Sequence, residues 1–519
     1  MSGYLRRLAT TGAAYTAASI LSKVIAVALL PLYTRYLSPA DYGTAEVLFT
    51  AVVVASIVVR FGLIEAILRF YYRDDEDPAA VVRSSFAGLF WLSTLGALVL
   101  LPLAGPLAEL LIPEPEHLGE SVPELVRIAI GGLWVLTMWE FMLTLFRLEE
   151  RARAYFLTTL LNVLASIALT VVLVVGFEDG AGGLLLGSYL AGGAFVLGLI
   201  ALQRRRLSLR IDRALLRRLF RFGLPTMPAE ASLYLLNFVD RLIIARSLSV
   251  AEVGLYSLAV KFAQAVNVLV RGFQLAWPPL AYSIRDDDEA RAAYATIVTL
   301  FVAGCAWVVA GMWLLSRWIV RALAAPQFFG SYEAVGLIST AVTLYALYMV
   351  LVVILGRTGR TEFNLPAAVG GLVANVALNL LLVPAMGITG AGLALVVSYL
   401  VVLGLMYVYT QRLFPVPYEW GRLLRVVLTV AVLVGIGELV VPTSGAAGLL
   451  IRVVLFAAYP VALFATGFFS AGERRWLARL RHPGAVAAGL ASLRAQPAAV
   501  DGHVPEIYEA ERMDEDAHP

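Results

Sequence analysis

The seven residues Leu37-Ser38-Pro39-Ala40-Asp41-Tyr42-Gly43 recur 211 residues later as Leu248-Ser249-Val250-Ala251-Glu252-Val253-Gly254. At the same offset, Arg60 corresponds to Arg271. A second match follows at an offset of 210, where Gly180-Ala181-Gly182 and Ser188-Tyr189-Leu190 reappear as Gly390-Ala391-Gly392 and Ser398-Tyr399-Leu400. Internal repeats in an apolar chain are typical of transporters built from two related bundles. The repeat therefore predicts two halves of similar structure.

The composition indicates a helical protein that crosses a membrane many times. Of the 519 residues, 60% are hydrophobic and 15% are charged, and the mean hydropathy is +0.82. Apolar runs such as 157–176 and 393–409 are too long for strands, and helices satisfy every backbone group within one segment. The single cysteine, Cys305, excludes a disulfide within the chain and a cysteine metal site. No metal-binding, phosphate-loop or dinucleotide motif is present, so we expect no metal and no cofactor.

The apolar segments predict an all-α protein with fourteen transmembrane helices, because each is about the 20 residues needed to cross the hydrocarbon core. Arg6 and Arg7 precede an apolar run with no convincing cleavage site, so we expect a retained first span rather than a signal peptide. The predicted spans are 12–36, 42–70, 84–108, 124–147, 155–176, 182–203, 222–247, 252–277, 293–316, 333–356, 363–384, 388–411, 422–441 and 446–469.

Loop charge predicts the orientation, because cytoplasmic loops carry an excess of arginine and lysine. The linker 203–221 contains eight arginines, and arginines also follow the last span. Loop 109–124 contains five glutamates and no arginine or lysine. We therefore expect both termini in the cytoplasm; the family resemblance described below implies the inner membrane of a bacterial cell.

Six spans separate repeat-equivalent positions, so the two halves run parallel and are related by a pseudo-two-fold axis along the membrane normal. Apolar residues alternate with arginines in the linker, which predicts an amphipathic helix on the membrane surface. The predicted divisions are an N-lobe at 1–203 (spans 1–6), a basic cytoplasmic linker at 204–221, a C-lobe at 222–412 (spans 7–12), spans 13 and 14 at 413–470, and a largely disordered cytoplasmic tail at 471–519.

The repeated heptad itself has a structural explanation. Ser38 with Asp41, and Ser249 with Glu252, have the spacing of a helix N-cap and its N3 residue. Pro39 suits the first helical position. The two heptads therefore mark the starts of spans 2 and 8, and we favour this interpretation over substrate contact.

The only two lysines, Lys23 and Lys261, both lie in the middle of predicted spans. Each charge inside a span costs roughly 2.5–3.5 kcal/mol on insertion scales, so such residues face a wet cavity or a partner. At helical periodicity Lys261 shares a face with Gln264, Asn267 and Arg271. These positions predict a cationic cavity lined by spans 1, 2, 7 and 8. Its candidate substrate-binding residues are Lys23, Arg60, Lys261, Arg271, Gln264 and Asn267.

A positive cavity implies an anionic cargo, since arginine and lysine are the usual partners of phosphate. Intramembrane carboxylates would balance the cavity charge and carry a coupling proton or sodium ion. The candidates for charge balance and coupling are Glu46, Glu230, Asp240 and Arg241.

Several intramembrane polar residues have structural interpretations as well. Arg60 and Arg271 could snorkel to the interface. Asp240 or Arg241 could form a structural ion pair, and Glu140 could be structural. Neutral polar residues in other spans are expected to form hydrogen bonds between helices; these include Asn162, Asn375 and Asn379.

Two stretches carry a resemblance to a known family. The segments SKVIAVALLPLYTRYLSPADYG (22–43) and FGLPTMPAEASLYLLNFVDRLIIARSLSVAEVGLYSLAVKF (222–262) resemble the two half-starts of bacterial polysaccharide flippases of the Wzx type, for O-antigen or exopolysaccharide. These belong to the multidrug/oligosaccharidyl-lipid/polysaccharide (MOP) exporter superfamily. The likeness covers most of residues 5–470. It is most specific at Asn237, Asp240 and Arg241, followed by Gly254-Leu255-Tyr256-Ser257.

The resemblance implies a two-lobed carrier that works by alternating access. The expected function is translocation of undecaprenyl-diphosphate-linked oligosaccharide across the cytoplasmic membrane, for cell-surface polysaccharide biosynthesis. The expected partners are this glycan and membrane lipids, with polysaccharide polymerase and glycosyltransferases as further candidates; no nucleic acid and no enzymatic activity are expected.

Three alternative functions fit the sequence less well. A multidrug exporter of the same superfamily would need a net acidic cavity for cationic drugs. A peptidoglycan-precursor exporter usually carries an Arg-Asp pair in the first span, where this chain has Lys23 and Val24. A membrane glycan polymerase would need a large extramembrane loop, and no loop between the predicted spans exceeds about 20 residues.

Overall fold

The computed structural model describes residues 25, 27–73, 75–113, 121–470 and 472–474. The described chain is helical, with no strand assigned to these residues. The helices between residues 30 and 465 belong to one compact unit, residues 10–466. Most of the first span, including Lys23, and nearly all of the tail 471–519 lie outside the described residues.

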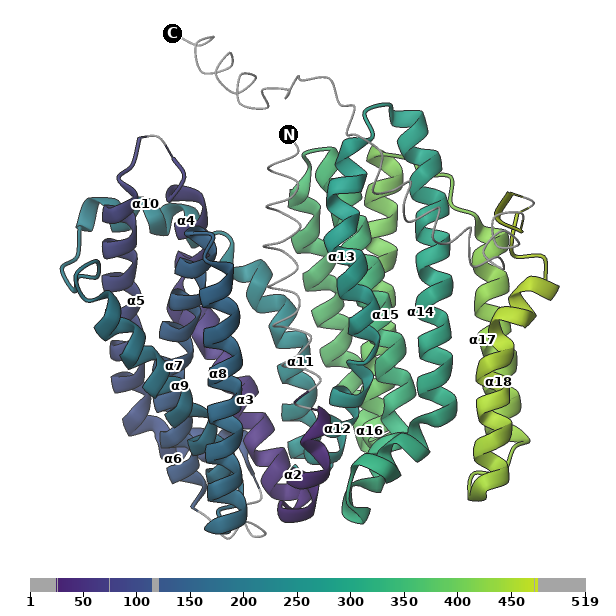
Figure 1. Ribbon diagram of the computed structural model, residues 1–519, viewed down its shortest axis with the longest axis horizontal. Coiled ribbons are helices and arrows are strands. Elements are labelled where there is room, and N and C mark those ends of the chain that lie inside the picture. The colour runs from purple at the N-terminus through teal and green to yellow at the C-terminus, as the bar shows by residue number, and fades with distance from the viewer. Residues whose placement is uncertain (1–24, 26, 74, 114–120, 471, 475–519) are drawn as a thin grey trace. The chain divides into compact units, whose positions relative to one another are not determined.

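The N-lobe follows the predicted order of spans (Figure 1). Span 1 is described only at its end, where α2 is formed. Span 2 is divided into α3 and α4, and span 3 continues through a short 3-10 turn into α6. The elements are α2 (Leu30–Tyr36), α3 (Pro39–Arg60), α4 (Leu63–Phe70), α5 (Pro78–Leu100), η1 (Leu101–Leu103), α6 (Ala104–Leu111), α7 (Val122–Leu148), α8 (Ala152–Val171), η3 (Val172–Gly176) and α9 (Ala181–Gln203).

The C-lobe and the appended hairpin contain the remaining spans. Span 8 is divided into α12 and α13, and α16 contains spans 11 and 12, joined at Gly387 with φ 63° and ψ −145°. The elements are α10 (Arg213–Gly223), α11 (Met227–Ser247), α12 (Val250–Ala263), α13 (Val266–Ser283), α14 (Asp287–Leu323), η4 (Pro326–Ser331), α15 (Tyr332–Arg357), η5 (Thr361–Phe363), α16 (Asn364–Leu413), α17 (Trp420–Leu439) and α18 (Gly445–Ala465).

Nine helical segments among the described residues are long and apolar enough to cross a membrane, and α16 supplies two spans. The predicted spans not among these nine are the first, the charged α11, the broken pair α12–α13, and α17. The fold is therefore a multi-pass helical membrane protein of two six-helix lobes with two further C-terminal helices, as the sequence predicts.

The repeated heptads begin α3 and α12, as expected. The Ser38 hydroxyl accepts a hydrogen bond from the Asp41 amide, and the Asp41 carboxylate accepts one from the Ser38 amide, so the capping box is complete. Ser249 accepts from the Glu252 amide at 3.2 Å. The capping interpretation is confirmed at both sites.

The heptads also make the principal contact between the lobes, since α3 packs against α12. A Cβ atom on Gly43 would overlap the carbonyl oxygen of Val250, and one on Gly254 would overlap that of Pro39. Small residues let helix backbones approach this closely. Nearby, the side-chain amide of Gln327 in η4 donates to the carbonyl oxygens of Thr34 and Leu37 at 3.1 and 2.9 Å.

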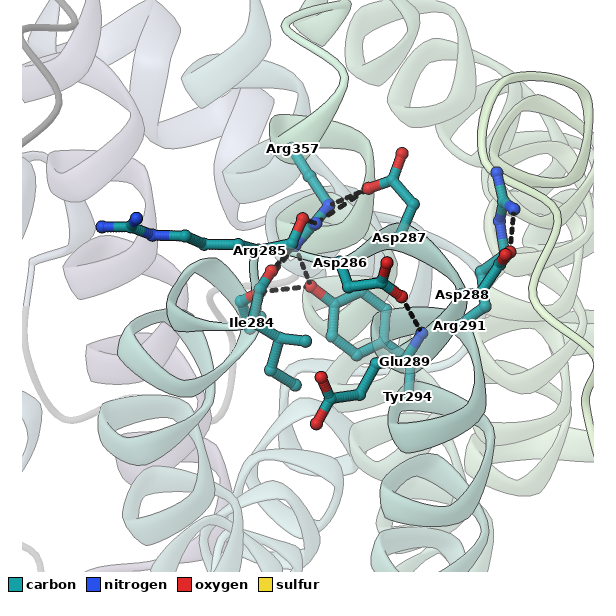
Figure 2. Close-up of polar contacts among 10 residues, drawn as sticks. Ile284, Arg285, Asp286, Asp287, Asp288, Glu289, Arg291, Tyr294 and Arg357 are labelled. Carbon is teal, nitrogen blue, oxygen red and sulfur yellow. Dashed lines mark hydrogen bonds and ion pairs between the residues drawn. The ribbon is translucent and has the colours of Figure 1, made fainter.

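At the opposite end of the lobes, each turn between the second and third spans is tied to the end of the fourth. In the C-lobe, Arg357 donates to the carbonyl oxygens of Ile284 at 2.7 Å and Arg285 at 3.1 Å, and to Asp287 at 2.8 Å (Figure 2). In the N-lobe, the Tyr72 hydroxyl donates to the Leu148 carbonyl at 2.8 Å. The two lobes thus stabilise equivalent turns with different side chains.

Candidate functional site

Intramembrane charges gather where α3 of the N-lobe meets α11 and α12 of the C-lobe. We call this group the seam cluster; it consists of Glu46 and Arg60 on α3, Glu140 on α7, Glu230 and Arg241 on α11, and Lys261 on α12. These helices pack directly on one another. The charges predicted from sequence are therefore neutralised largely by pairing across the two lobes.

Lys261 of the C-lobe makes its polar contacts with the N-lobe. Its Nζ atom lies 2.6 Å from Oε1 of Glu46. The same nitrogen lies 4.9 Å from the centre of the Tyr42 ring, a cation–π distance. Lys261 occupies the last turn of α12, and Glu46 lies one turn beyond the Gly43 crossing.

Arg241 is the second C-lobe cation that faces Glu46. Its Nη2 atom lies 3.8 Å from the Glu46 carboxylate, and its Nε donates to the Ser257 hydroxyl at 3.1 Å. Arg241 is 7% exposed. One carboxylate of the N-lobe is therefore the counter-ion for two cations of the C-lobe.

Arg60 is buried between two carboxylates. It forms an ion pair with Glu140 of its own lobe and lies 3.4 Å from Oε1 of Glu230 on α11. Its Nε also donates to the Ser56 carbonyl at 3.1 Å, and the residue is 6% exposed. Arg60 is thus a second charge contact between the lobes, with Glu140 as a partner inside the N-lobe.

Arg271, by contrast, is exposed on α13, and no ion pair involving it is found in the described part of the chain. Gln264 and Asn267 flank the break between α12 and α13, where the Asn267 amide donates to the Gln264 carbonyl at 2.9 Å. Both side chains are partly exposed. Their predicted roles in substrate binding stay predictions, as does that of Lys23, which lies outside the described residues.

Asp240 lies inside the C-lobe rather than at the seam. It is fully buried, and its carboxylate accepts hydrogen bonds from the Tyr256 hydroxyl at 2.9 Å and from Asn379 Nδ2 at 2.7 Å. The same Nδ2 also donates to the backbone carbonyl of Asn375 at 2.9 Å, and both asparagines are fully buried on α16. The interhelical role expected for these residues is confirmed at Asn379, which links α16 to α11.

The charge pattern of the sequence did not indicate the aromatic partners of Lys261 and Asp240. Tyr42 and Tyr256 belong to the sequence motifs, yet they also contact Lys261 and Asp240 respectively. A usable signal existed for Tyr256, because it stands in the stretch Gly254-Leu255-Tyr256-Ser257 that carries the family resemblance.

The pairing of Arg60 with Glu140 accounts for a further intramembrane charge. A structural role was one interpretation of Glu140 from the sequence, and a counter-ion for Arg60 fits that interpretation. Its partner explains why a carboxylate lies in the middle of the apolar helix α7.

The fold is similar to those of several solved membrane transporters. The structure of the lipid II flippase MurJ, in an inward closed conformation, matches with a TM-score of 0.69 and 11% identity, over 87% of this chain and 99% of that one. An inward-facing multidrug resistance MATE family transporter of the MOP superfamily matches with a TM-score of 0.61 and 16% identity, over 76% of this chain and 94% of the other. A MOP superfamily transporter from Pyrococcus furiosus matches with a TM-score of 0.56 and 16% identity, over 78% of this chain and 94% of that one.

Residues 9–285, just over half of the chain, match the family described as "Polysaccharide biosynthesis protein". The chain belongs to this family. The succinoglycan biosynthesis transport protein ExoT of Rhizobium meliloti (strain 1021) is a relative, 24% identical over 330 residues. That alignment covers 62% of this chain and 64% of the relative, so it spans less than two thirds of the relative's length.

Proposed function

We propose that this protein is a flippase that moves a polyprenyl-diphosphate-linked oligosaccharide across the cytoplasmic membrane by alternating access. The observation that carries the proposal is the pairing of Lys261 and Arg241 of one lobe with Glu46 of the other. When the lobes separate, Lys261 and Arg241 lose the Glu46 carboxylate, and lysine and arginine are the usual partners of phosphate. Membership of the polysaccharide biosynthesis family supports a glycan as the remainder of the cargo.

In this mechanism Glu46 is an internal substitute for the cargo phosphate. When the carrier is empty, Glu46 neutralises Lys261 and Arg241 and allows the lobes to meet at the seam. When cargo enters, its diphosphate takes over these cations and releases Glu46. A ligand shifts a conformational equilibrium only through such differential contacts with the two states.

Arg60 supplies the second switchable contact. Its pairing with Glu230 joins α3 to α11 across the lobes, whereas its pairing with Glu140 stays within the N-lobe. Separation of the lobes therefore leaves Arg60 with one carboxylate and frees Glu230. Arg271, exposed on α13, would contact the cargo beside Gln264 and Asn267, and Lys23 would complete the cationic lining.

The coupling and the topology complete the proposal. Asp240 is positioned by Tyr256 and Asn379, and a proton or sodium ion bound there would power the cycle.

We place both termini in the cytoplasm and the protein in the bacterial inner membrane, on the strength of the arginines in 203–221 and the glutamates in 109–124. The glycan would be delivered by glycosyltransferases on one side and received by a polymerase on the other.

Transport of a fluorescent polyprenyl-diphosphate oligosaccharide in proteoliposomes tests the proposal. We expect Lys261→Met to reduce transport by at least about tenfold, because a hydrogen bond to a charged group contributes about 1.5–3 kcal/mol. The matched control is Arg127→Gln, which removes one positive charge from an exposed position on α7 and should transport normally. Equal transport by Lys261→Met and the parent protein would refute a role for Lys261 in cargo binding.

A further inference from the structure

A second cation-rich site lies away from the seam cluster, at the end of the N-lobe where α10 crosses α4. A cavity of about 590 Å³ is bounded there by α4, the turn that follows it, and α10. We call it the α10 cavity. It is lined by Arg69, Phe70, Arg73, Asp75, Glu76, Arg218, Arg221 and Phe222. The lining thus contains four arginines and two carboxylates.

Both carboxylates of the α10 cavity are already engaged. Asp75 binds the guanidinium of Arg73 at 2.8 and 2.7 Å, and this contact lowers the pKa of Asp75. Glu76 binds Arg218 through two hydrogen bonds of 3.0 Å. These two bidentate pairs leave Arg69 and Arg221 as surplus positive charge in the cavity.

Arg69 and Arg221 form no ion pair with any carboxylate that the structure describes, a set that omits Asp74. Arg69 stacks on the Phe222 ring, with Cζ 4.6 Å from its centre, and Arg73 lies 5.3 Å from the centre of the Phe70 ring. Stacking on an aromatic face leaves the edge N–H groups of a guanidinium available, and this fork matches the geometry of phosphate.

The position of α10 indicates which phosphate-bearing molecule would reach this cavity. This helix has arginines on one side, and on the other it buries Leu215 and Leu219 against the apolar core of the N-lobe. A basic amphipathic helix of this kind lies in the plane of the membrane interface. The anion that reaches the α10 cavity most readily is therefore the headgroup of a lipid.

We propose that the α10 cavity binds the phosphate group of a membrane lipid through Arg69 and Arg221. A phosphate held by both residues joins α4 to α10 and so fastens the linker helix to the N-lobe. Beyond Arg221 the chain passes through Gly223, where an added Cβ would overlap the Gly62 carbonyl, and then enters α11 of the C-lobe. The bound lipid thus stabilises the connection between the lobes. This proposal does not depend on the identity of the transported cargo.

Native mass spectrometry of the full-length protein tests the site with three separate probes: phosphatidylglycerol, undecaprenyl phosphate and phosphatidylcholine. The test variant is R69Q/R221Q. The matched control is R213Q/R217Q, which removes two exposed arginines from the same helix outside the cavity. Losing one direct hydrogen bond between a charged side chain and a bound phosphate lowers affinity by at least about tenfold. We therefore expect R69Q/R221Q to weaken phosphatidylglycerol binding at least about tenfold. R213Q/R217Q, which loses no such hydrogen bond, should change it less than about twofold.

The probes distinguish the source of the phosphate. If R69Q/R221Q loses only phosphatidylglycerol binding, the ligand of the α10 cavity is an ordinary phospholipid. If it loses only undecaprenyl phosphate binding, the ligand is a prenyl lipid that docks before transport. An additional variant, Glu76→Gln, frees Arg218 and should strengthen binding of whichever probe the site prefers. Equal effects of R69Q/R221Q and R213Q/R217Q on every probe would overturn the proposal, since they would indicate general surface attraction.

Discussion

At the scale of single residues, Glu46 is the least replaceable member of the seam cluster. It lies within 2.6 Å of Lys261 and 3.8 Å of Arg241, and its side chain is 13% exposed. Removing one partner of a buried ion pair leaves an uncompensated charge, which is strongly destabilising. Glu46 is therefore expected to govern both the stability of the seam and the affinity for anions.

Glu46→Gln should separate these two effects. Without the carboxylate, Lys261 has lost its ion-pair partner, so we expect isothermal titration calorimetry to show pyrophosphate binding about tenfold more tightly. The transport rate should fall, because the empty carrier no longer neutralises its own cations. Glu149→Gln, which changes a carboxylate that pairs outside the seam with Arg151 and Arg206, is the control. Weaker pyrophosphate binding in Glu46→Gln would contradict the proposal that the Glu46 carboxylate takes the place of the cargo phosphate in the empty carrier.

Tyr256→Phe tests the buried Asp240 network. The substitution removes one of the two hydrogen bonds that the carboxylate accepts from Tyr256 and Asn379. A buried acceptor left with an unmade hydrogen bond costs about 1–3 kcal/mol. We expect a lower thermal unfolding temperature in nanodiscs and a weakened dependence of transport on the coupling ion. An unchanged unfolding temperature would show that the Tyr256 hydroxyl contributes nothing to the C-lobe.

At the scale of helices, the crossing of α3 and α12 determines whether the seam cluster can assemble. Gly43 and Gly254 face the partner backbone so closely that neither position has room for a methyl group. Glu46 lies three residues after Gly43, so a change in the separation of the helices moves it relative to Lys261. Helix approach and ion pairing are therefore coupled.

Gly43→Ala should push α3 away from α12 and weaken the contact between the lobes. In a Cys305→Ala background, cysteines introduced at Ala40 and Ala251 report on this approach through the rate of disulfide formation. We expect cross-linking to slow at least about fivefold in Gly43→Ala. Gly131→Ala is the control, because a Cβ there meets nothing within 4 Å. Equal cross-linking rates in the two variants would mean that the crossing tolerates a methyl group.

At the scale of the whole molecule, the distribution of charge in the loops predicts how the protein is oriented in the membrane. The linker 203–221 carries eight arginines and loop 109–124 carries five glutamates. The positive-inside rule assigns the linker to the cytoplasm. An odd number of predicted spans, three, separates the two segments, so the glutamates are expected on the outer side.

Cysteine labelling in intact cells tests this orientation in a Cys305→Ala background. Ser121→Cys and Ala214→Cys both place the thiol at an exposed position of the described chain. We expect a membrane-impermeant maleimide to modify Ser121→Cys in intact cells, and Ala214→Cys only after permeabilisation. The opposite pattern would reverse the orientation and move the α10 cavity to the outer surface.

Much of the architecture depends on residues that lie close together in the chain, and it could therefore be predicted from the sequence. Hydropathy over about 20 residues located the spans, because a helix must satisfy its own backbone in lipid. The spacing of Ser38 and Asp41 predicted the start of α3, because a capping box involves residues only three apart. The amphipathic helix α10 was likewise readable from its periodicity. The repeat predicted the two lobes, and intramembrane charge identified most residues of the seam cluster.

The partners of those charges were decided only by the tertiary structure. Glu46 and Lys261 lie 215 positions apart in the sequence, and they meet because α3 and α12 cross at two glycines. The repeat made Arg60 and Arg271 equivalent, yet Arg60 is buried and Arg271 is exposed. The reason is geometric: α3 is continuous to Arg60, whereas the C-lobe helix breaks at Gln264 and Ala265, before Arg271. A break changes the direction of every later side chain, and no residue pattern in this chain predicted its position.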